Sequence, residues 1–147
     1  MQDRNEVSIL IVEDDDGHAR LIEKNLKRAG ISNQISRVEN GRKALDFLFS
    51  EGAFVGKERP SPLLVLLDLN MPVMDGYQVL ERMKADARTH RVPVVVLTTT
   101  DDAREVARCY ELGCSVYITK PVEYEGFAAA IQQLGLFMSI VTVPNGE

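Results

Sequence analysis

The order of segments along this chain predicts an α/β fold, with a five-stranded, doubly wound parallel sheet flanked by five helices. Short apolar runs rich in β-branched residues alternate with amphipathic helical patterns five times within 147 residues. This alternation is typical of strand–helix units in a parallel sheet. Three of the runs are continuously apolar, as expected for strands that are buried on both faces. A chain of this length suits one compact domain.

Three strands are predicted by uninterrupted apolar sequence and two by weaker runs. The uninterrupted runs are VSILIV, LLVLL and VVVL, at residues 7–12, 63–67 and 94–97. A proline stands directly before the second and the third of these runs and marks where each strand begins. The weaker strands are expected at residues 34–38 and 116–119.

Helices are predicted between these strands, because apolar residues recur there every three or four positions. The expected helices are residues 17–29, a segment from about 41, residues 76–87, residues 102–112 and a segment from about 123. The first has Ala19, Ile22 and Leu26 on one face, and Gly30 is its stop signal.

Chemically active side chains follow four of the five strands. The first strand ends in an acidic run that begins with Glu13 and Asp14, and the others are followed by Asp68, Thr98 and Lys120. The carboxyl ends of parallel strands meet at one edge of the sheet, where doubly wound proteins bind their ligands. We therefore expect carboxylates, a hydroxyl and an ammonium to lie together in one site.

This set of side chains suits phosphoryl chemistry beside a divalent cation. Converging carboxylates repel and raise each other's pKa, and a bound cation relieves that repulsion. Mg²⁺ prefers oxygen ligands and usually takes one or two carboxylates together with waters. A carboxylate beside such a cation can act as a nucleophile and form an aspartyl phosphate. Lys120 would then supply a positive charge and Thr98 a hydrogen bond to the phosphoryl group.

Each of these residues also has a purely structural interpretation. An acidic run before a helix often caps it, with Asp15 or Asp16 as the cap here. An aspartate after a strand is often a turn former, and Lys120 could be a solvated surface lysine. His18 is expected to face solvent on the first helix. The functional interpretation is favoured because all four features stand at the appropriate strand ends together.

Four segments of the chain resemble the receiver domains of bacterial response regulators, in the same order and spacing. They are ILIVEDD, LLDLNMPVMDG, VVVLTTT and VYITKP, and the resemblance covers about residues 7–134. It implies the flavodoxin-like receiver fold and a role in two-component signal transduction. The chain would accept a phosphoryl group from a histidine kinase with the help of Mg²⁺ or Mn²⁺. No enzymatic activity is implied beyond self-phosphorylation and autodephosphorylation.

The resemblance also implies roles for residues around the cation. Asp68 matches the phosphoacceptor and a metal ligand, and Asp14 matches the second carboxylate ligand of the metal. Glu13 matches an acidic residue that reaches the metal through water. Asn70 matches the residue that ligates the metal through its backbone carbonyl.

The resemblance implies that a second group of residues binds the phosphoryl group and changes conformation when it is bound. Thr98 and Lys120 match the hydroxyl and the ammonium that contact it, and Pro121 would follow a cis peptide bond that directs Lys120 inward. Tyr117 matches the family's switch aromatic, although ordinary core packing is the alternative. On phosphorylation Thr98 would move toward the phosphoryl group and Tyr117 would rotate inward. The face of the fourth helix, fifth strand and fifth helix would change as a result.

The C-terminal segment, residues 135–147, is a largely apolar extension of the single domain expected over residues 1–147. It is too short for a DNA-binding or enzymatic output domain, so signalling is expected to proceed by protein contact or as one step of a phosphorelay. The extension either covers the chain's own core or docks on a second copy to form a homodimer. With the long connection at residues 51–62, it makes the chain similar to regulators paired with phytochrome-type kinases. That similarity implies a bacteriophytochrome as the partner kinase.

Composition limits the partners and the location. The formal net charge is −5, which disfavours a general DNA-binding or anionic-membrane surface. No apolar run approaches the ~18–20 residues that span a bilayer, and the N-terminus lacks the layout of a signal peptide. Cys109 and Cys114 suit a reducing compartment as small packed side chains. A cytoplasmic location is therefore expected.

Two other functions compete with this interpretation. A phosphohydrolase of the haloacid dehalogenase type would need a second aspartate two residues after its nucleophile, where this chain has Asn70. The other competitor is a receiver-like module that binds proteins without being phosphorylated. The complete acidic set argues against that module.

Overall fold

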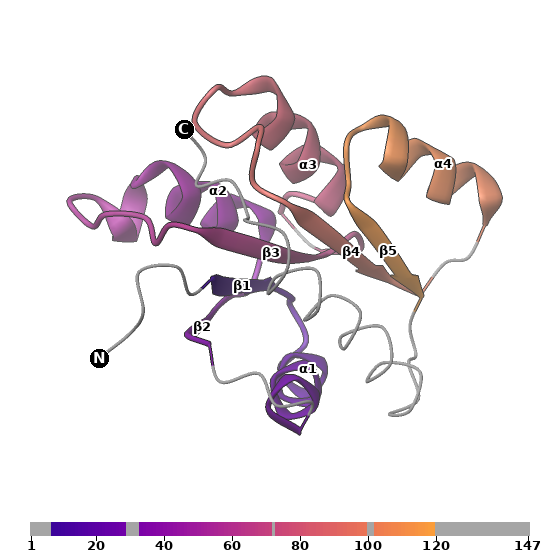
Figure 1. Ribbon diagram of the computed structural model, residues 1–147, viewed down its shortest axis with the longest axis horizontal. Coiled ribbons are helices and arrows are strands. Elements are labelled where there is room, and N and C mark those ends of the chain that lie inside the picture. The colour runs from indigo at the N-terminus through magenta and orange to yellow at the C-terminus, as the bar shows by residue number, and fades with distance from the viewer. Residues whose placement is uncertain (1–6, 29–32, 72, 100–101, 120–147) are drawn as a thin grey trace.

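The computed structural model describes residues 7–28, 33–71, 73–99 and 102–119, and these residues form the predicted α/β fold (Figure 1). The elements are β1 (Ser8–Val12), α1 (Asp16–Arg28), β2 (Ile35–Val38), α2 (Gly41–Phe49), the 3-10 helix η1 (Gly52–Phe54), β3 (Leu63–Asp68), α3 (Gly76–Ala85), β4 (Val94–Thr98), α4 (Ala103–Glu111) and β5 (Val116–Thr119). The fifth predicted helix, from about Glu123, lies outside the described residues. Within the described part of the chain, no helix has the length and apolar character to cross a membrane.

The strands pair in parallel in the order β2-β1-β3-β4-β5. β1 pairs with β2 on one side and with β3 on the other, so the direction of winding reverses at β1. In doubly wound sheets a ligand binds beside this reversal, at the carboxyl ends of the strands. α1 lies on one face of the sheet, and α2, α3 and α4 lie on the other (Figure 1).

Two layers of apolar side chains hold the helices on the sheet, because successive strand residues point to opposite faces. In β1, Leu10 and Val12 belong to the layer shared with α2 and α3. Ile9 and Ile11 belong to the layer shared with α1. All residues of β1, β3 and β4 are buried, as their continuous apolar runs predict.

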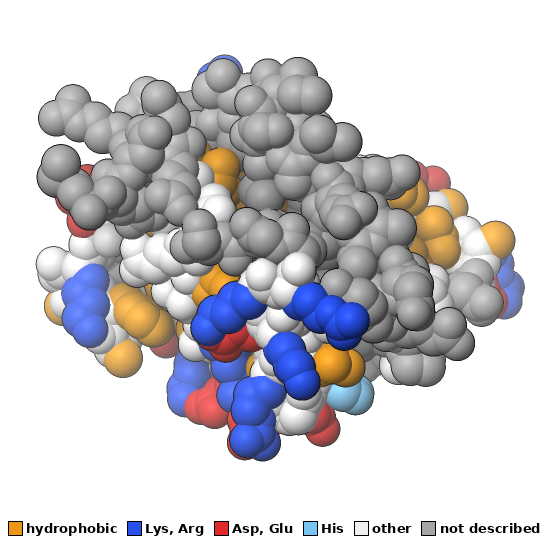
Figure 2. All heavy atoms as spheres, turned by 60° about the horizontal axis from the view of Figure 1, so that its bottom comes forward, with side chains coloured by type: hydrophobic (Ala, Val, Ile, Leu, Met, Phe, Trp, Pro, Cys, Tyr) orange, Lys and Arg blue, Asp and Glu red, His pale blue; other side chains and the backbone are white. Residues whose placement is uncertain are grey.

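α1 shows the amphipathic pattern that its sequence predicts. Ala19, Ile22 and Leu26 are buried against the sheet. Basic side chains gather on the outer face of this helix, as the space-filling view shows (Figure 2). The exposed basic residues of α1 are Arg20, Lys24, Lys27 and Arg28.

Both cysteines are free and buried, which confirms their interpretation as packed side chains. Burial raises the pKa of the Cys109 thiol, and it raises the pKa of the Cys114 thiol to about 11. A thiol with such a pKa is almost entirely protonated at neutral pH, and the protonated form is a poor nucleophile and metal ligand.

The helix termini follow local capping rules. Asn40 accepts a hydrogen bond from the Lys43 backbone and begins α2, and Asp75 forms a capping box with Gln78 at the start of α3. The helix expected over residues 76–87 ends at Ala85, two residues early. Asp86 is extended there, and its carboxylate accepts hydrogen bonds from the backbone and the guanidinium of Arg88.

Residues 51–62 form a long connection between α2 and β3, and this connection folds back on α2. The ring of Phe54 in η1 lies 5.2 Å from the ring of Phe47, edge to face. The connection ends at a cis peptide bond between Ser61 and Pro62, directly before β3. The cis bond predicted between Lys120 and Pro121 lies outside the described residues.

Gly76 lets the start of α3 lie directly against the end of β3. A Cβ at this position would overlap the carbonyl oxygen of Asp68 and the Cα of Leu69, and the Gly76 N–H donates to the Leu69 carbonyl at 3.0 Å. Gly41, at the start of α2, has the same role toward the carbonyl of Met74. These two glycines therefore set the path of the loop that follows Asp68.

Val73, in the same loop, has a backbone conformation that valine rarely adopts. Its φ is 70°, in the left-handed region, and the side chain is 79% exposed. A β-branched residue in this region is strained by roughly 1–2 kcal/mol. At this exposure the side chain has little burial with which to offset that cost.

We predict that Gly76→Ala lowers the free energy of unfolding by roughly 3 kcal/mol, because the added methyl group meets backbone atoms that cannot rotate away. Urea unfolding followed by circular dichroism measures this, since the chain has no tryptophan. Gly17→Ala is the matched control: its Cβ would meet only the Asp15 carboxylate at 3.2 Å, which can shift. Equal losses in both variants would contradict the proposed backbone contact.

We predict that Val73→Gly raises the free energy of unfolding by about 0.5–1 kcal/mol, since relief of the left-handed strain exceeds the entropy cost of glycine. Val55→Gly is the control. Val55 is also exposed, at 69%, but has a φ of −56°, so this substitution should destabilise the protein. The same urea titration compares them, and a loss of stability in both variants would refute the strain at Val73.

Candidate functional site

Three carboxylates meet where β1 and β3 leave the sheet. Glu13 and Asp14 follow β1, and Asp68 ends β3. One carboxylate oxygen from each residue lies within 4.8 Å of the others. The strands cause this, since β1 and β3 are parallel neighbours with Val12 paired to Leu67. The sequence prediction that these residues converge is confirmed.

Burial makes this group electrostatically demanding. Glu13 is 1% exposed and Asp68 5% exposed, while Asp14 is open to solvent. A divalent cation bound among carboxylates this close would offset the repulsion between them. The donor set consists of oxygen atoms alone, which fits a hard cation such as Mg²⁺ or Mn²⁺ better than Zn²⁺. Asp14 is the member of this group that solvent can reach.

Asn70 connects Asp68 with the next strand of the sheet. Its backbone N–H donates to Asp68 Oδ1 at 3.2 Å, and its side-chain Nδ2 donates to Thr98 Oγ1 at 3.3 Å. Thr98 ends β4 and is fully buried. The predicted hydroxyl thus lies at the same edge of the sheet as Asp68.

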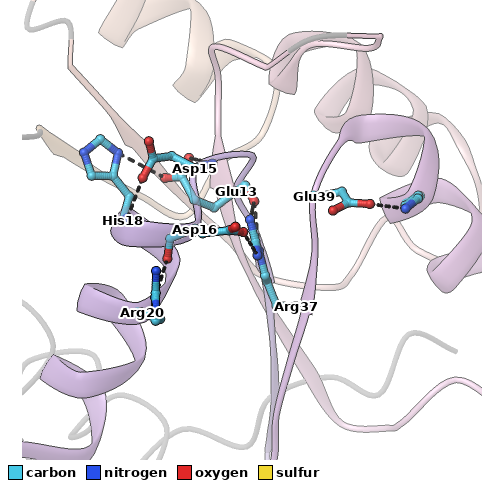
Figure 3. A network of polar contacts seen from close by, with 8 residues as sticks. Glu13, Asp15, Asp16, His18, Arg20, Arg37 and Glu39 are labelled. Atoms are coloured by element: carbon cyan, nitrogen blue, oxygen red, sulfur yellow. Dashed lines mark hydrogen bonds and ion pairs between the residues drawn. The ribbon is translucent and has the colours of Figure 1, made fainter.

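The acidic run after β1 divides between the carboxylate group and the start of α1, and Figure 3 shows the contacts of Asp15 and Asp16 at the start of that helix. Asp15 caps α1 by accepting a hydrogen bond from the backbone of His18 at 2.8 Å. Asp16 pairs with Arg37 of β2, with Nη1 and Oδ1 2.5 Å apart. The capping interpretation therefore holds for Asp15, while Glu13 and Asp14 belong to the carboxylate group.

Two residues near the carboxylates received no site role from the sequence. Arg37 donates from Nε and Nη2 to the backbone carbonyl of Glu13, at 3.1 and 2.8 Å. His18 is half exposed, and its Nδ1 lies 4.0 Å from Glu13 Oε1. An arginine inside a short strand is the only sequence signal for Arg37. That signal does not reveal which carbonyl the side chain reaches.

The remaining predicted residues are described in part. Tyr117 of β5 is partly buried and packs against the apolar layer shared with α2 and α3. Both the switch role and ordinary packing are compatible with this position. Lys120, Pro121 and the extension at residues 135–147 lie outside the described residues.

Comparison with known proteins identifies the family. The family model for the response regulator receiver domain matches residues 9–132. A solved receiver domain from Rhodospirillum rubrum is 54% identical, with a TM-score of 0.80, and the match covers 96% of this chain and 99% of that one.

The descriptions of two further relatives mention a phytochrome or a bound metal ion. Response regulator Rcp1 of Synechocystis is 36% identical over 92% of each chain. The Mn²⁺-bound structure of Rcp1 matches with a TM-score of 0.81 at 34% identity, over 94% of this chain and 99% of that one. The phosphorylated cyanobacterial phytochrome response regulator RcpA matches with a TM-score of 0.82 at 32% identity, over 95% of this chain and 99% of that one. A sheet with this strand order, three carboxylates at its reversal point and a family match over most of the chain lead to one conclusion: this protein belongs to the response regulator receiver domain family.

Proposed function

We propose that Asp68 accepts a phosphoryl group from a histidine kinase, with Mg²⁺ or Mn²⁺ held by Asp14, Asp68, the Asn70 carbonyl and, through water, Glu13. The observation that carries this proposal is the meeting of Glu13, Asp14 and Asp68 within 4.8 Å. A bound cation would neutralise these carboxylates and the oxygens of the incoming phosphoryl group.

The chemical step requires little from the protein beyond position. A carboxylate oxygen of Asp68 attacks phosphorus, the new P–O bond forms, and the bond from phosphorus to the kinase histidine breaks. The leaving imidazole takes up a proton. Asn70 connects the Thr98 hydroxyl with Asp68, because it donates one hydrogen bond to each of them. Lys120 is proposed to supply the positive charge opposite the phosphoryl group.

The same contacts support a switch. In the structure the Thr98 hydroxyl accepts a hydrogen bond from Asn70. A phosphoryl group on Asp68 would offer it a stronger, charged partner, so we propose that Thr98 turns toward it and that Tyr117 moves into the space behind. α4 suits such a change, because Cys109 is the buried residue of this helix. A helix with few buried contacts can shift at low cost.

The partners in this proposal follow the relatives. RcpA is a phytochrome response regulator by its description, so we propose a bacteriophytochrome as the kinase. We further propose one receiver domain over residues 1–147, cytoplasmic and without enzymatic activity of its own. It would signal by protein contact rather than by DNA binding, in keeping with the net charge of −5. A phosphorelay intermediate is the alternative.

We predict that Asp68→Asn abolishes labelling by a radiolabelled histidine kinase or by acetyl phosphate in the presence of Mg²⁺, because the amide is not nucleophilic. Asp75→Asn is the matched control, since Asp75 only caps α3 and asparagine is an equally good cap. That variant should keep full labelling, and a chelator should remove it from the wild type.

Full labelling of Asp68→Asn would show that the phosphoacceptor is another residue. A wild-type chain that neither kinase nor acetyl phosphate labels would support the alternative of a binding module that takes no phosphate.

We predict that removal of residues 136–147 converts a homodimer into a monomer, because this apolar segment is proposed to dock on a second copy. Light scattering over a dilution series measures the mass of the full and truncated chains, and circular dichroism checks that the truncated chain is folded. The same oligomeric state for the two chains would contradict this docking and favour the alternative, in which the segment covers the protein's own core.

A further inference from the structure

We propose that Arg37 of β2 is a positioning residue for the cation site, although it does not belong to the carboxylate group. It fixes the backbone between Glu13 and Asp16 and so sets the directions in which the Glu13 and Asp14 carboxylates point. This inference rests on the proposed function, in which these carboxylates hold a divalent cation.

The guanidinium of Arg37 holds the acidic run at both of its ends (Figure 3). Nε and Nη2 donate to the Glu13 carbonyl at 3.1 and 2.8 Å, and Nη1 donates to Asp16 Oδ1 at 2.5 Å. Three of the five N–H donors of one planar group therefore contact two residues, Glu13 and Asp16, at the two ends of a run of four. A fixed fork of this kind leaves little freedom for Asp14, which lies between the two anchor points.

The position of Arg37 near the end of β2 explains how its side chain reaches the Glu13 carbonyl. β1 and β2 pair up to Val12 and Val38, and the Glu13 N–H still donates to the Val38 carbonyl at 3.1 Å. Beyond Val38 the chain turns into α2, so the regular pairing of β1 with β2 ends there. The Arg37 fork supplies two donors to the Glu13 carbonyl at this point. Arg37 is 27% exposed and Asp16 75% exposed, so solvent weakens the contact with Asp16 more than the part-buried hydrogen bonds to the Glu13 carbonyl.

Charge and geometry predict opposite effects of Arg37 on a bound cation. By Coulomb interaction alone, a guanidinium near the carboxylates repels a second cation, so removing it would tighten metal binding. If Arg37 positions the ligands instead, removing it loosens the backbone and weakens metal binding. The sign of the change in affinity therefore distinguishes the two roles.

The side chain can be replaced without crowding the core. Arg37 lines an open pocket between α1 and the sheet, together with Ile11, Asp16, Ala19, Arg20 and Glu23. Arg37→Met keeps a side chain of similar reach without the donors. Arg37→Lys keeps the charge but loses the fork.

The test measures Mn²⁺ affinity directly, by calorimetry or by electron paramagnetic resonance, with the metal alone and no phosphodonor. We expect the Mn²⁺ Kd to rise roughly tenfold in Arg37→Met, as found when groups that orient metal ligands are removed. Arg37→Lys should show a smaller rise. Arg42→Met is the control, since Arg42 pairs with Asp46 on α2, and its Kd should be unchanged.

Urea unfolding without metal separates positioning from general stability. A Kd that stays the same or falls in Arg37→Met, with or without a loss of stability, would overturn the proposal. If Arg37→Met does not fold, Arg37→Lys decides the matter, because an unchanged Kd in that variant also overturns it. A wild-type chain that binds no Mn²⁺ would instead refute the cation site of the proposed function.

Discussion

The parallel pairing of β1 with β3 is the constraint on which the site depends. Val12 and Leu67 are register partners, so Glu13 and Asp68 leave the sheet side by side. Both residues are buried, and their carboxylate oxygens lie within 4.8 Å of each other. Every residue of both strands is buried as well. The apolar strands behind the two carboxylates therefore fix the points from which they leave the sheet.

Backbone contacts outside the carboxylate group keep the site in shape. Gly76 brings α3 against the carbonyl of Asp68, Asn70 connects Asp68 with Thr98, and Arg37 holds the carbonyl of Glu13. Each contact ties the loop after one strand to a neighbouring element. Two of these residues, Gly76 and Arg37, lie outside the proposed cation ligands, and support of ligating groups by such neighbours is a general property of metal sites.

The two sides of the molecule differ in how firmly they are held. The rim at β1 and β3 is fixed by buried strands and by these loop contacts, whereas α4 has Cys109 as its buried residue and leaves Tyr110 half exposed. A rigid site beside a weakly held helix suits a protein in which a local change of charge at Asp68 alters a distant surface. Thr98 and Tyr117 lie on β4 and β5, the strands between this rim and α4.

By itself the sequence determined the fold class, the strand order along the chain and the meeting of Glu13, Asp14 and Asp68, because apolar periodicity and the residues at strand ends are local properties. It could not divide the acidic run into the cap Asp15 and the ion-pair partner Asp16, since the partner, Arg37, stands 21 positions away. It also missed the left-handed backbone of Val73. Those features depend on which strands and loops come together in space, and only the tertiary structure decides that.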